Sequence, residues 1–172
     1  MKRLSFIIFQ LSFSVALALL MAACSTLTPE EKAARQAENL RVAKEKVDNK
    51  QYRVVVTQMK PIRGSSRQIS NSFIKIDGDM MDCFLPYVGL DDIPRPKSPG
   101  ERRMDSRYEG KQAIENYQLT LVPEKESILV TFSTHYGGDD LKFAILINKK
   151  GKASVRLTPQ NRDDIEYEGY VS

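Results

Sequence analysis

The hydrophobic positions along the chain follow three successive patterns. Residues 4–20 are mostly apolar with four polar interruptions, residues 30–49 repeat small apolar side chains every three or four positions, and apolar and polar residues alternate from residue 51 onward. A period near 3.6 indicates a helix, and a period of two indicates a strand. The order therefore predicts an apolar leader, one helix and then a β domain.

The predicted helix begins at Pro29. Thr28 is a suitable N-cap, proline fits the first helical position, and Glu31 completes a capping box. No glycine or proline follows until after Asn49, so we expect the helix over residues 29–49. Its apolar stripe is narrow and rich in alanine. Such a helix either lies shallowly on the domain, which we favour, or forms a charged spacer.

The β domain is predicted over residues 50–172. Asp77-Gly78 supplies the positive φ values of a type I′ hairpin turn, and a turn at Lys150-Gly151 aligns two apolar faces. The predicted fold is mainly β, an antiparallel meander of about eight strands that forms either a barrel or a sandwich. The alternating segments are residues 51–57, 69–76, 80–85, 114–122, 127–135, 141–148, 152–158 and 165–171.

One long irregular segment interrupts the alternation at residues 89–110. It is rich in proline, and its five basic side chains are balanced by five acidic ones, so it is not a cationic patch. Long loops on a β scaffold are often functional or mobile. We favour a plain flexible loop over a lid that contacts a ligand.

The apolar leader has the features of an export signal. Lys2 and Arg3 precede it, and it ends in Leu20-Met21-Ala22-Ala23-Cys24, which resembles the lipobox of bacterial lipoproteins. We therefore expect a signal peptide at residues 1–23, a lipid-bearing Cys24 and a tether at residues 24–28. Acyl chains on Cys24 would hold the protein to a membrane of the cell envelope, on its periplasmic face or at the outer membrane. An uncleaved transmembrane helix is the alternative, but the polar interruptions argue against it.

Charge and cysteine content argue against a nucleic-acid partner and against an intramolecular disulfide. The chain has 26 basic and 22 acidic side chains, and loss of Lys2 and Arg3 leaves a net charge near +2, too weak to indicate a nucleic-acid partner. Cys24 is assigned to lipid attachment, so Cys83 is alone and forms no intramolecular disulfide. Stability must therefore come from packing.

No set of residues predicts catalysis, a metal site or a cofactor. His135 is the only histidine, and an exposed position at a strand end is the simpler interpretation of it. Cys83 lies in an apolar run and fits a buried core thiol better than a nucleophile. Asp77, Asp79 and Asp82 lack the further ligands of a calcium loop, and turn chemistry explains Asp77 better.

Several short motifs in the β domain together resemble one known family. Their order and spacing, from about residue 43 to residue 171, are similar to the Bacteroidetes lipoproteins that carry the domain of unknown function numbered 4251. The resemblance implies an envelope lipoprotein with a β domain and no assigned activity. The motifs are Gly64-Ser65-Ser66-Arg67, Gly78-Asp79, Leu85-Pro86-Tyr87 with Gly89, Gly151 with Ala153 and Val155, and Asn161-Arg162 followed by Ile165, Tyr167 and Gly169. The chain departs from the family after Tyr87, where Val88, Leu90 and the charged loop replace an aromatic, glycine-rich run.

The candidate site residues are Arg67, Tyr87, Asn161, Arg162 and Tyr167. Arg162 can form a fork with a carboxylate from a neighbouring strand, so the group acts either as a structural clasp, which we favour, or in ligand recognition. Our preferred function is a non-enzymatic domain that binds an envelope protein, a glycan or a lipid. The alternatives are a structural or assembly component of an envelope complex and a hydrolase that uses His135 with a carboxylate.

Overall fold

The structure, a computed structural model, describes residues 28–89 and 104–172. The predicted signal peptide, Cys24, most of the tether and most of the proline-rich segment lie outside the described residues. The elements are helix α2 Pro29–Asp48, strands β1 Gln51–Pro61, β2 Arg67–Asp77, β3 Met80–Gly89, β4 Met104–Val122, β5 Ser127–Tyr136, β6 Asp139–Asn148, β7 Lys152–Pro159 and β8 Ile165–Val171, and the short 3-10 helix η1 Pro123–Lys125.

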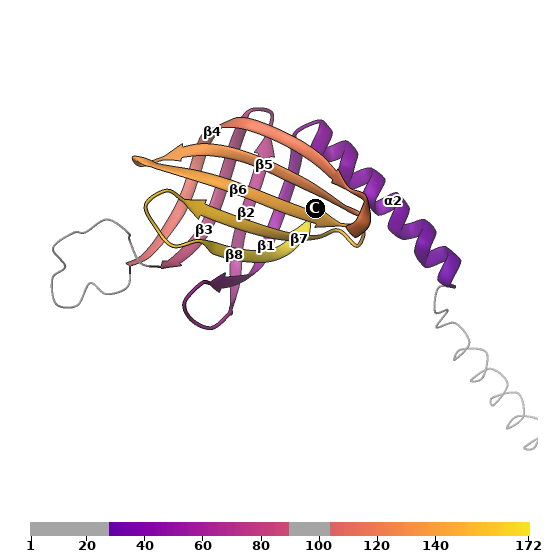
Figure 1. Cartoon of the computed structure of the whole chain (residues 1–172), viewed down its shortest axis with the longest axis horizontal. Helices are drawn as coiled ribbons and strands as arrows, with labels where there is room; N and C mark the ends of the chain where they lie inside the picture. Colours follow the sequence, from indigo (N-terminus) through magenta and orange to yellow (C-terminus); the bar gives the residue numbers. More distant parts are fainter. Residues whose placement is uncertain (1–27, 90–103) are drawn as a thin grey trace, which may run out of the picture. The chain divides into compact units, whose positions relative to one another are not determined.

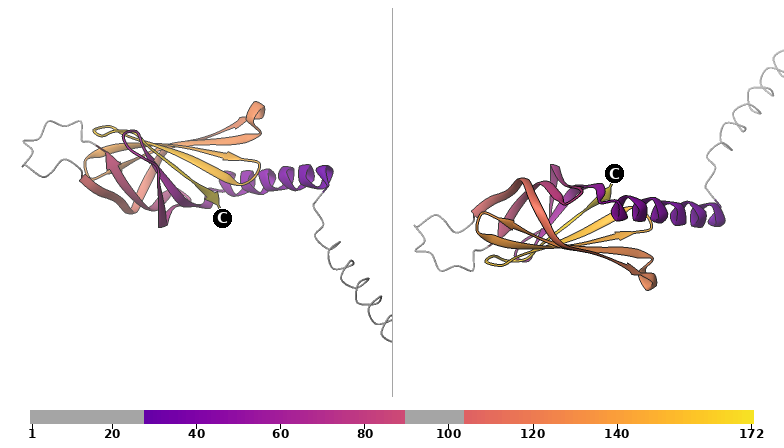
Figure 2. Two further views of the ribbon diagram at one scale, coloured as in Figure 1. Left: turned by 90° about the horizontal axis from the view of Figure 1, so that it is seen from below. Right: turned by 90° about the horizontal axis from the view of Figure 1, so that it is seen from above.

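The eight strands of the described residues form a closed antiparallel barrel (Figure 1). Each strand pairs with the next along the chain, and β8 pairs with β1 to close the ring. Figure 2 shows the same meander from below and from above. The predicted mainly β fold with one preceding helix is confirmed, and of the two predicted arrangements the sheet forms the barrel.

The seam between β1 and β8 depends on a bulge and a glycine. Val56 pairs with Gly169 and Gln58 pairs with Glu168, so Thr57 is the extra residue of a bulge in β1. A Cβ atom at Gly169 would lie 1.9 Å from the Val55 carbonyl oxygen. The two backbones therefore approach too closely for any side chain at Gly169.

The interior of the barrel is filled by side chains from all eight strands. The predicted face that joins residues 141–147 to residues 153–157 is confirmed, because Ile147 pairs with Ala153 and Ile145 with Val155, and all four are buried. The largest fully buried side chains, listed in order of volume, are Tyr87, Tyr108, Tyr167, Phe143, Ile74, Ile76, Met81, Leu85, Ile128, Leu141, Ile145 and Ile147. Their burial supplies the main stabilisation of the barrel.

Several strands are longer than the sequence predicted, and two of the differences change the local structure. The turn between β2 and β3 is Gly78-Asp79 instead of Asp77-Gly78, because Asp77 pairs with Met80. Gly78 has a φ of 62°, whereas the φ of Asp79 is not positive. A positive φ at the first turn residue alone indicates a type II′ turn instead of the expected type I′. Strand β4 begins at Met104 because its residues 104–110 pair with β3, so the irregular segment predicted over 89–110 ends earlier.

The N-terminal residues of α2 are capped as predicted. The Thr28 backbone N–H donates to Glu31 Oε2 at 2.8 Å, and the Glu31 N–H donates to Thr28 Oγ1 at 3.2 Å. Within residues 36–48, Ala43 and Val47 are buried in the barrel core, so this half of the helix packs on the domain. Across residues 28–89 and 104–172, none of the helices combines the length and the apolar character needed to span a membrane.

Candidate functional site

The two ends of the barrel are built differently. Residues 36–48 of α2 lead into β1 at one end, which we call the helix end; there the Tyr117 hydroxyl donates to the Val47 carbonyl oxygen at 3.0 Å. At the opposite end, which we call the loop end, β1 turns into β2, β5 into β6, and β7 into β8. The loop end brings together most of the candidate residues predicted from the sequence.

Buried tyrosines fill the loop end. The Tyr87 hydroxyl donates to the Asp163 carbonyl oxygen, and the Tyr167 hydroxyl donates to the Pro86 carbonyl oxygen, each at 2.9 Å. The rings of Tyr87 and Tyr108 meet edge to face with centroids 5.5 Å apart. All three tyrosines are at most 1% exposed. These rings and hydroxyls therefore act in packing and in satisfying backbone groups.

Arg162 covers this aromatic layer. Its guanidinium carbon lies 5.5 Å from the Tyr87 ring centroid and 5.7 Å from that of Tyr108, within the range of cation–π contacts. Arg162 Nε is 3.7 Å from Asp139 Oδ2 at the start of β6, and the Asp139 side chain is only 9% exposed. Asp139 Oδ1 also accepts hydrogen bonds from the Asn161 backbone N–H at 3.2 Å and from Asn161 Nδ2 at 3.3 Å.

The contacts of Asn161 and Arg162 have the character of a clasp. They join the loop between β7 and β8 to the first residue of β6, through a carboxylate that is nearly buried. Gly89 belongs to the same arrangement, because a Cβ there would lie 2.2 Å from the Tyr87 hydroxyl oxygen. The Arg162 side chain keeps 23% exposure, so this edge of the cluster reaches solvent.

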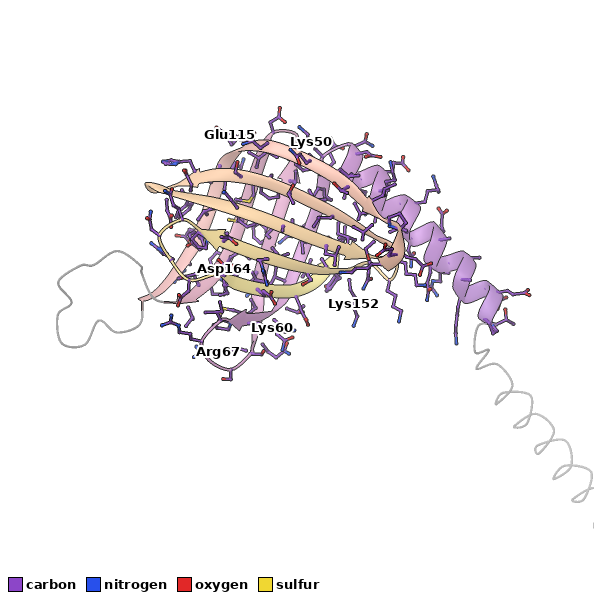
Figure 3. All side chains as sticks on the ribbon, viewed as in Figure 1. Lys50, Lys60, Arg67, Glu115, Lys152 and Asp164 are labelled. Atoms are coloured by element: carbon purple, nitrogen blue, oxygen red, sulfur yellow. The ribbon has the colours of Figure 1, made fainter. Side chains whose placement is uncertain are left out.

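Arg67 does not join the clasp. It is exposed at the first position of β2, opposite Met59, and Figure 3 shows it beside the loop between β1 and β2. No carboxylate of residues 28–89 or 104–172 forms an ion pair with it. Four of the five predicted candidates therefore meet around the buried tyrosines, and Arg67, although it follows the β1–β2 turn at the same end, lies apart from them.

The residues weighed for catalysis lie in unfavourable places for it. His135 Nδ1 is 2.8 Å from Asp140 Oδ1, but the two side chains are 70% and 62% exposed. Burial raises the pKa of the Cys83 thiol to about 12, so the thiol stays protonated near neutral pH. Burial also raises the pKa of Tyr167 well above its ordinary value. Within the described ranges, no three histidine, cysteine or acidic side chains are grouped as metal ligands would be.

The outer wall carries a groove that sequence reasoning missed. It has a volume of about 410 Å³ and crosses β6, β7, β8 and β1 over the bulge at Thr57; we call it the seam groove. Tyr170, 49% exposed, and the exposed Lys152 are cross-strand partners on it, with Ser154 and Glu168 beside them. The alternation in β8 places Tyr170 outward, but only the closure of the barrel brings it beside Thr57.

A second outer depression of about 350 Å³ lies over β4 to β7. Its outward side chains include Lys142, Arg156 and Thr131 around the small Ala144, and the two aromatic residues at its base, Phe132 and Phe143, are buried. Arg156 is paired with Glu166, with the Nη2 and Oε1 atoms 2.7 Å apart. This depression therefore lacks the exposed aromatic ring of the seam groove.

Comparisons with known proteins agree with this architecture. The family model described as "Domain of unknown function (DUF4251)" matches residues 34–171. The chain belongs to the DUF4251 family. A crystal structure of a DUF4251 family protein from Bacteroides eggerthii is similar in fold, with a TM-score of 0.56 and 13% identity, covering 79% of this chain and 90% of that one. A search of curated proteins finds no match.

Several of the motifs quoted from the sequence have structural roles in this DUF4251 protein. Gly89 makes room for Tyr87, Gly169 makes room for the β1 backbone, and Asn161 with Arg162 binds the loop before β8 to Asp139. These motifs thus contribute to the closure of the barrel and of its loop end. The likeness to the crystal structure shows a shared fold and supplies no activity.

Proposed function

We propose that this DUF4251 protein is a lipid-anchored protein of the cell envelope whose barrel is a non-enzymatic binding domain. The anchoring part of the proposal rests on the lipobox-like ending Leu20-Met21-Ala22-Ala23-Cys24. A membrane attachment through acylated Cys24 would restrict the partners to molecules of the envelope, such as a protein, a glycan or a lipid.

The binding part of the proposal places the ligand on the outer wall. The side chains that point into the barrel, including Ile145, Val155 and Tyr167, are fully buried, and Arg162 covers the tyrosines at the loop end. A ligand inside would have to displace this packing, which is costly. The observation that carries the proposal is the seam groove, whose volume of about 410 Å³ falls within the range of small-molecule sites.

Binding is tested by thermal unfolding of the full chain in detergent. Separate additions of envelope oligosaccharides, phospholipid vesicles and soluble envelope proteins should include at least one that raises the melting temperature, because a ligand that binds only the folded state stabilises it. A Tyr170→Ala variant should lose that shift, and a Lys142→Ala variant in the second depression should keep it. If no addition changes the melting temperature, the binding function is overturned.

Anchoring is tested by intact-mass analysis of the protein from its own cells. We expect loss of residues 1–23 and a mass increase at Cys24 that matches attached acyl chains. A Cys24→Ala variant should leave the membrane fraction. An unmodified thiol at Cys24, or a retained leader, would remove the basis for an envelope location while leaving the binding function open.

A further inference from the structure

A row of apolar side chains runs across the outside of the barrel from the seam groove. Tyr170 of β8 pairs with Val55 of β1, Val55 with Phe73 of β2, and Phe73 with Phe84 of β3. All four point outward, in register, on adjacent strands about 4.8 Å apart, so the row spans about 14 Å. Outward positions of an antiparallel sheet are usually polar, so we treat this apolar row as a candidate surface.

Arginine side chains make cation–π contacts with two members of the apolar row. The guanidinium carbon of Arg53 is 4.1 Å from the ring centroid of Phe73, and that of Arg107 is 5.6 Å from the ring centroid of Phe84. A guanidinium stacked on a ring keeps its N–H edge available for a carboxylate or phosphate and loses little entropy on binding. The apolar row therefore presents cations beside its rings as well as apolar surface.

Two cations along the row lack an acidic partner. No carboxylate of the described residues forms an ion pair with Arg53 or Lys152, whereas Arg107 is 3.8 Å from Glu109 and Lys75 is 3.1 Å from Asp77. Figure 3 shows Lys152 at the helix end of the strands that border the seam groove. The carboxylate of Glu168 also lines the groove, but it is paired with Lys60, so the two cations without an acidic partner make the surface complementary to a ligand with two separated negative charges.

We propose that the seam groove and the apolar row together bind an acidic glycan. This inference rests on the proposed binding function and names its ligand class. The exposed ring of Tyr170 provides a platform for the apolar face of a sugar, and the hydroxyls of Thr57 and Ser154 lie in the same groove. Carboxylates on neighbouring sugars would meet Lys152 and Arg53.

A chain of sugars suits this surface better than an anionic membrane does. Tyr170 lines a groove, and the guanidinium groups of Arg53 and Arg107 contact the rings of Phe73 and Phe84. A flat bilayer cannot enter a groove, and insertion of the row into lipid would require burial of the stacked arginines. A flexible acidic chain can follow the groove and contact both cations.

The experiment is a calorimetric titration of the full chain in detergent. The ligands are a hexasaccharide that contains uronic acids, its carboxyl-reduced neutral counterpart, and vesicles with and without an anionic phospholipid. We expect the acidic hexasaccharide to bind at least about tenfold more tightly than the reduced one, because each lost ion pair weakens the complex. Arg53→Gln should weaken binding of the acidic ligand about tenfold and leave binding of the reduced one unchanged.

Further variants separate charge from stacking. Tyr170→Ala should weaken both hexasaccharides, and Arg53→Lys, which keeps the charge without the planar contact, should fall between wild type and Arg53→Gln. Lys142→Gln is the matched control, because Lys142 is an exposed cation of the second depression and should change nothing. Unchanged melting temperatures show that each variant is folded.

The outcomes of the titration test the acidic-glycan inference separately from the proposed binding function. Equal binding of the acidic and reduced hexasaccharides, wild-type binding by both Arg53→Gln and Tyr170→Ala, or binding to anionic vesicles alone would overturn the acidic-glycan inference while the binding function stands. If the chain binds none of these ligands and no other envelope molecule shifts its melting temperature, both fail.

Discussion

The loop end and the seam groove place similar side chains in opposite surroundings. At the loop end, Tyr167 is fully buried and donates to a backbone carbonyl, and Arg162 is held against two rings and Asp139. In the seam groove, Tyr170 is 49% exposed and Lys152 has no acidic partner among the described residues. A tyrosine beside a basic residue therefore marks a clasp in one place and an open surface in the other. Burial and pairing distinguish them.

The largest effect on stability is expected from a substitution at Gly169. It tests whether the backbone under the seam groove is as rigid as the clasp. Gly169→Val would place a side chain where a Cβ already lies 1.9 Å from the Val55 carbonyl oxygen. Strands β1 and β8 must separate to admit it, so we expect a loss of about 3 kcal/mol or more in the free energy of unfolding. Urea unfolding measures this loss.

Ser154→Ala is the control for that substitution, since Ser154 is exposed in the same groove and should keep wild-type stability. A folded Gly169→Val protein with unchanged stability would show that β1 moves aside easily. The seam would then be a soft part of the barrel, and its groove would have no fixed shape.

The sequence was sufficient to predict the strands but not the closure of the sheet into a barrel. Strict alternation over 141–147 and 153–157 predicted both the pairing of β6 with β7 and the buried face. Closure depends on the bulge at Thr57 meeting Gly169, and no local pattern connects these positions. For the same reason the seam groove was not predicted, because its residues come from both ends of the β domain.

The candidate site was predicted only as a set of residues. Asn161, Arg162, Tyr87 and Tyr167 were selected together, but Asp139, the partner of Asn161 and Arg162, was not among the candidates. The β5–β6 turn places Asp139 at the loop end, and its burial follows from the loop between β7 and β8 folding over it. Neither the length of a loop nor its path can be derived from alternation.

A matched pair of substitutions sharpens the comparison of the two tyrosines. Tyr167→Phe removes the hydroxyl of a fully buried side chain and should cost about 2 kcal/mol, because the Pro86 carbonyl oxygen loses the hydrogen bond that this hydroxyl donates. Tyr170→Phe removes a hydroxyl at an exposed position and should change stability by less than about 0.5 kcal/mol. Equal losses in urea unfolding would contradict the assignment of different roles.

A pH series tests the burial of the barrel interior through Cys83 of β3. Burial raises the pKa of Cys83 from an ordinary value of 9.0 to about 12, so the folded protein holds this proton more tightly than the unfolded chain does. Stability is then complete below pH 9 and falls as the pH rises toward 12. Between pH 8 and pH 10, Cys83 should account for a loss of about 1.4 kcal/mol.

Cys83→Ala isolates this contribution. The variant should be less stable at neutral pH because of the lost packing, but its stability should fall less between pH 8 and pH 10 than that of wild type. The fall that remains belongs to buried tyrosines such as Tyr167, whose pKa is also raised by burial. Identical pH profiles would mean that the thiol reaches solvent in the folded barrel.

The smallest expected effect concerns the exposed pair His135 and Asp140. Their ring nitrogen and carboxylate oxygen are 2.8 Å apart, yet both side chains are mostly solvated, and exposed pairs contribute little because water screens them. His135→Ala should change the free energy of unfolding by less than about 0.5 kcal/mol and should leave hexasaccharide binding unaltered, since neither outer groove includes His135. The two readouts are urea unfolding and the same calorimetric titration. If His135→Ala instead abolished a hydrolytic activity of wild type, His135 and Asp140 would be catalytic residues. The proposal that the protein is a non-enzymatic binding domain would then be wrong.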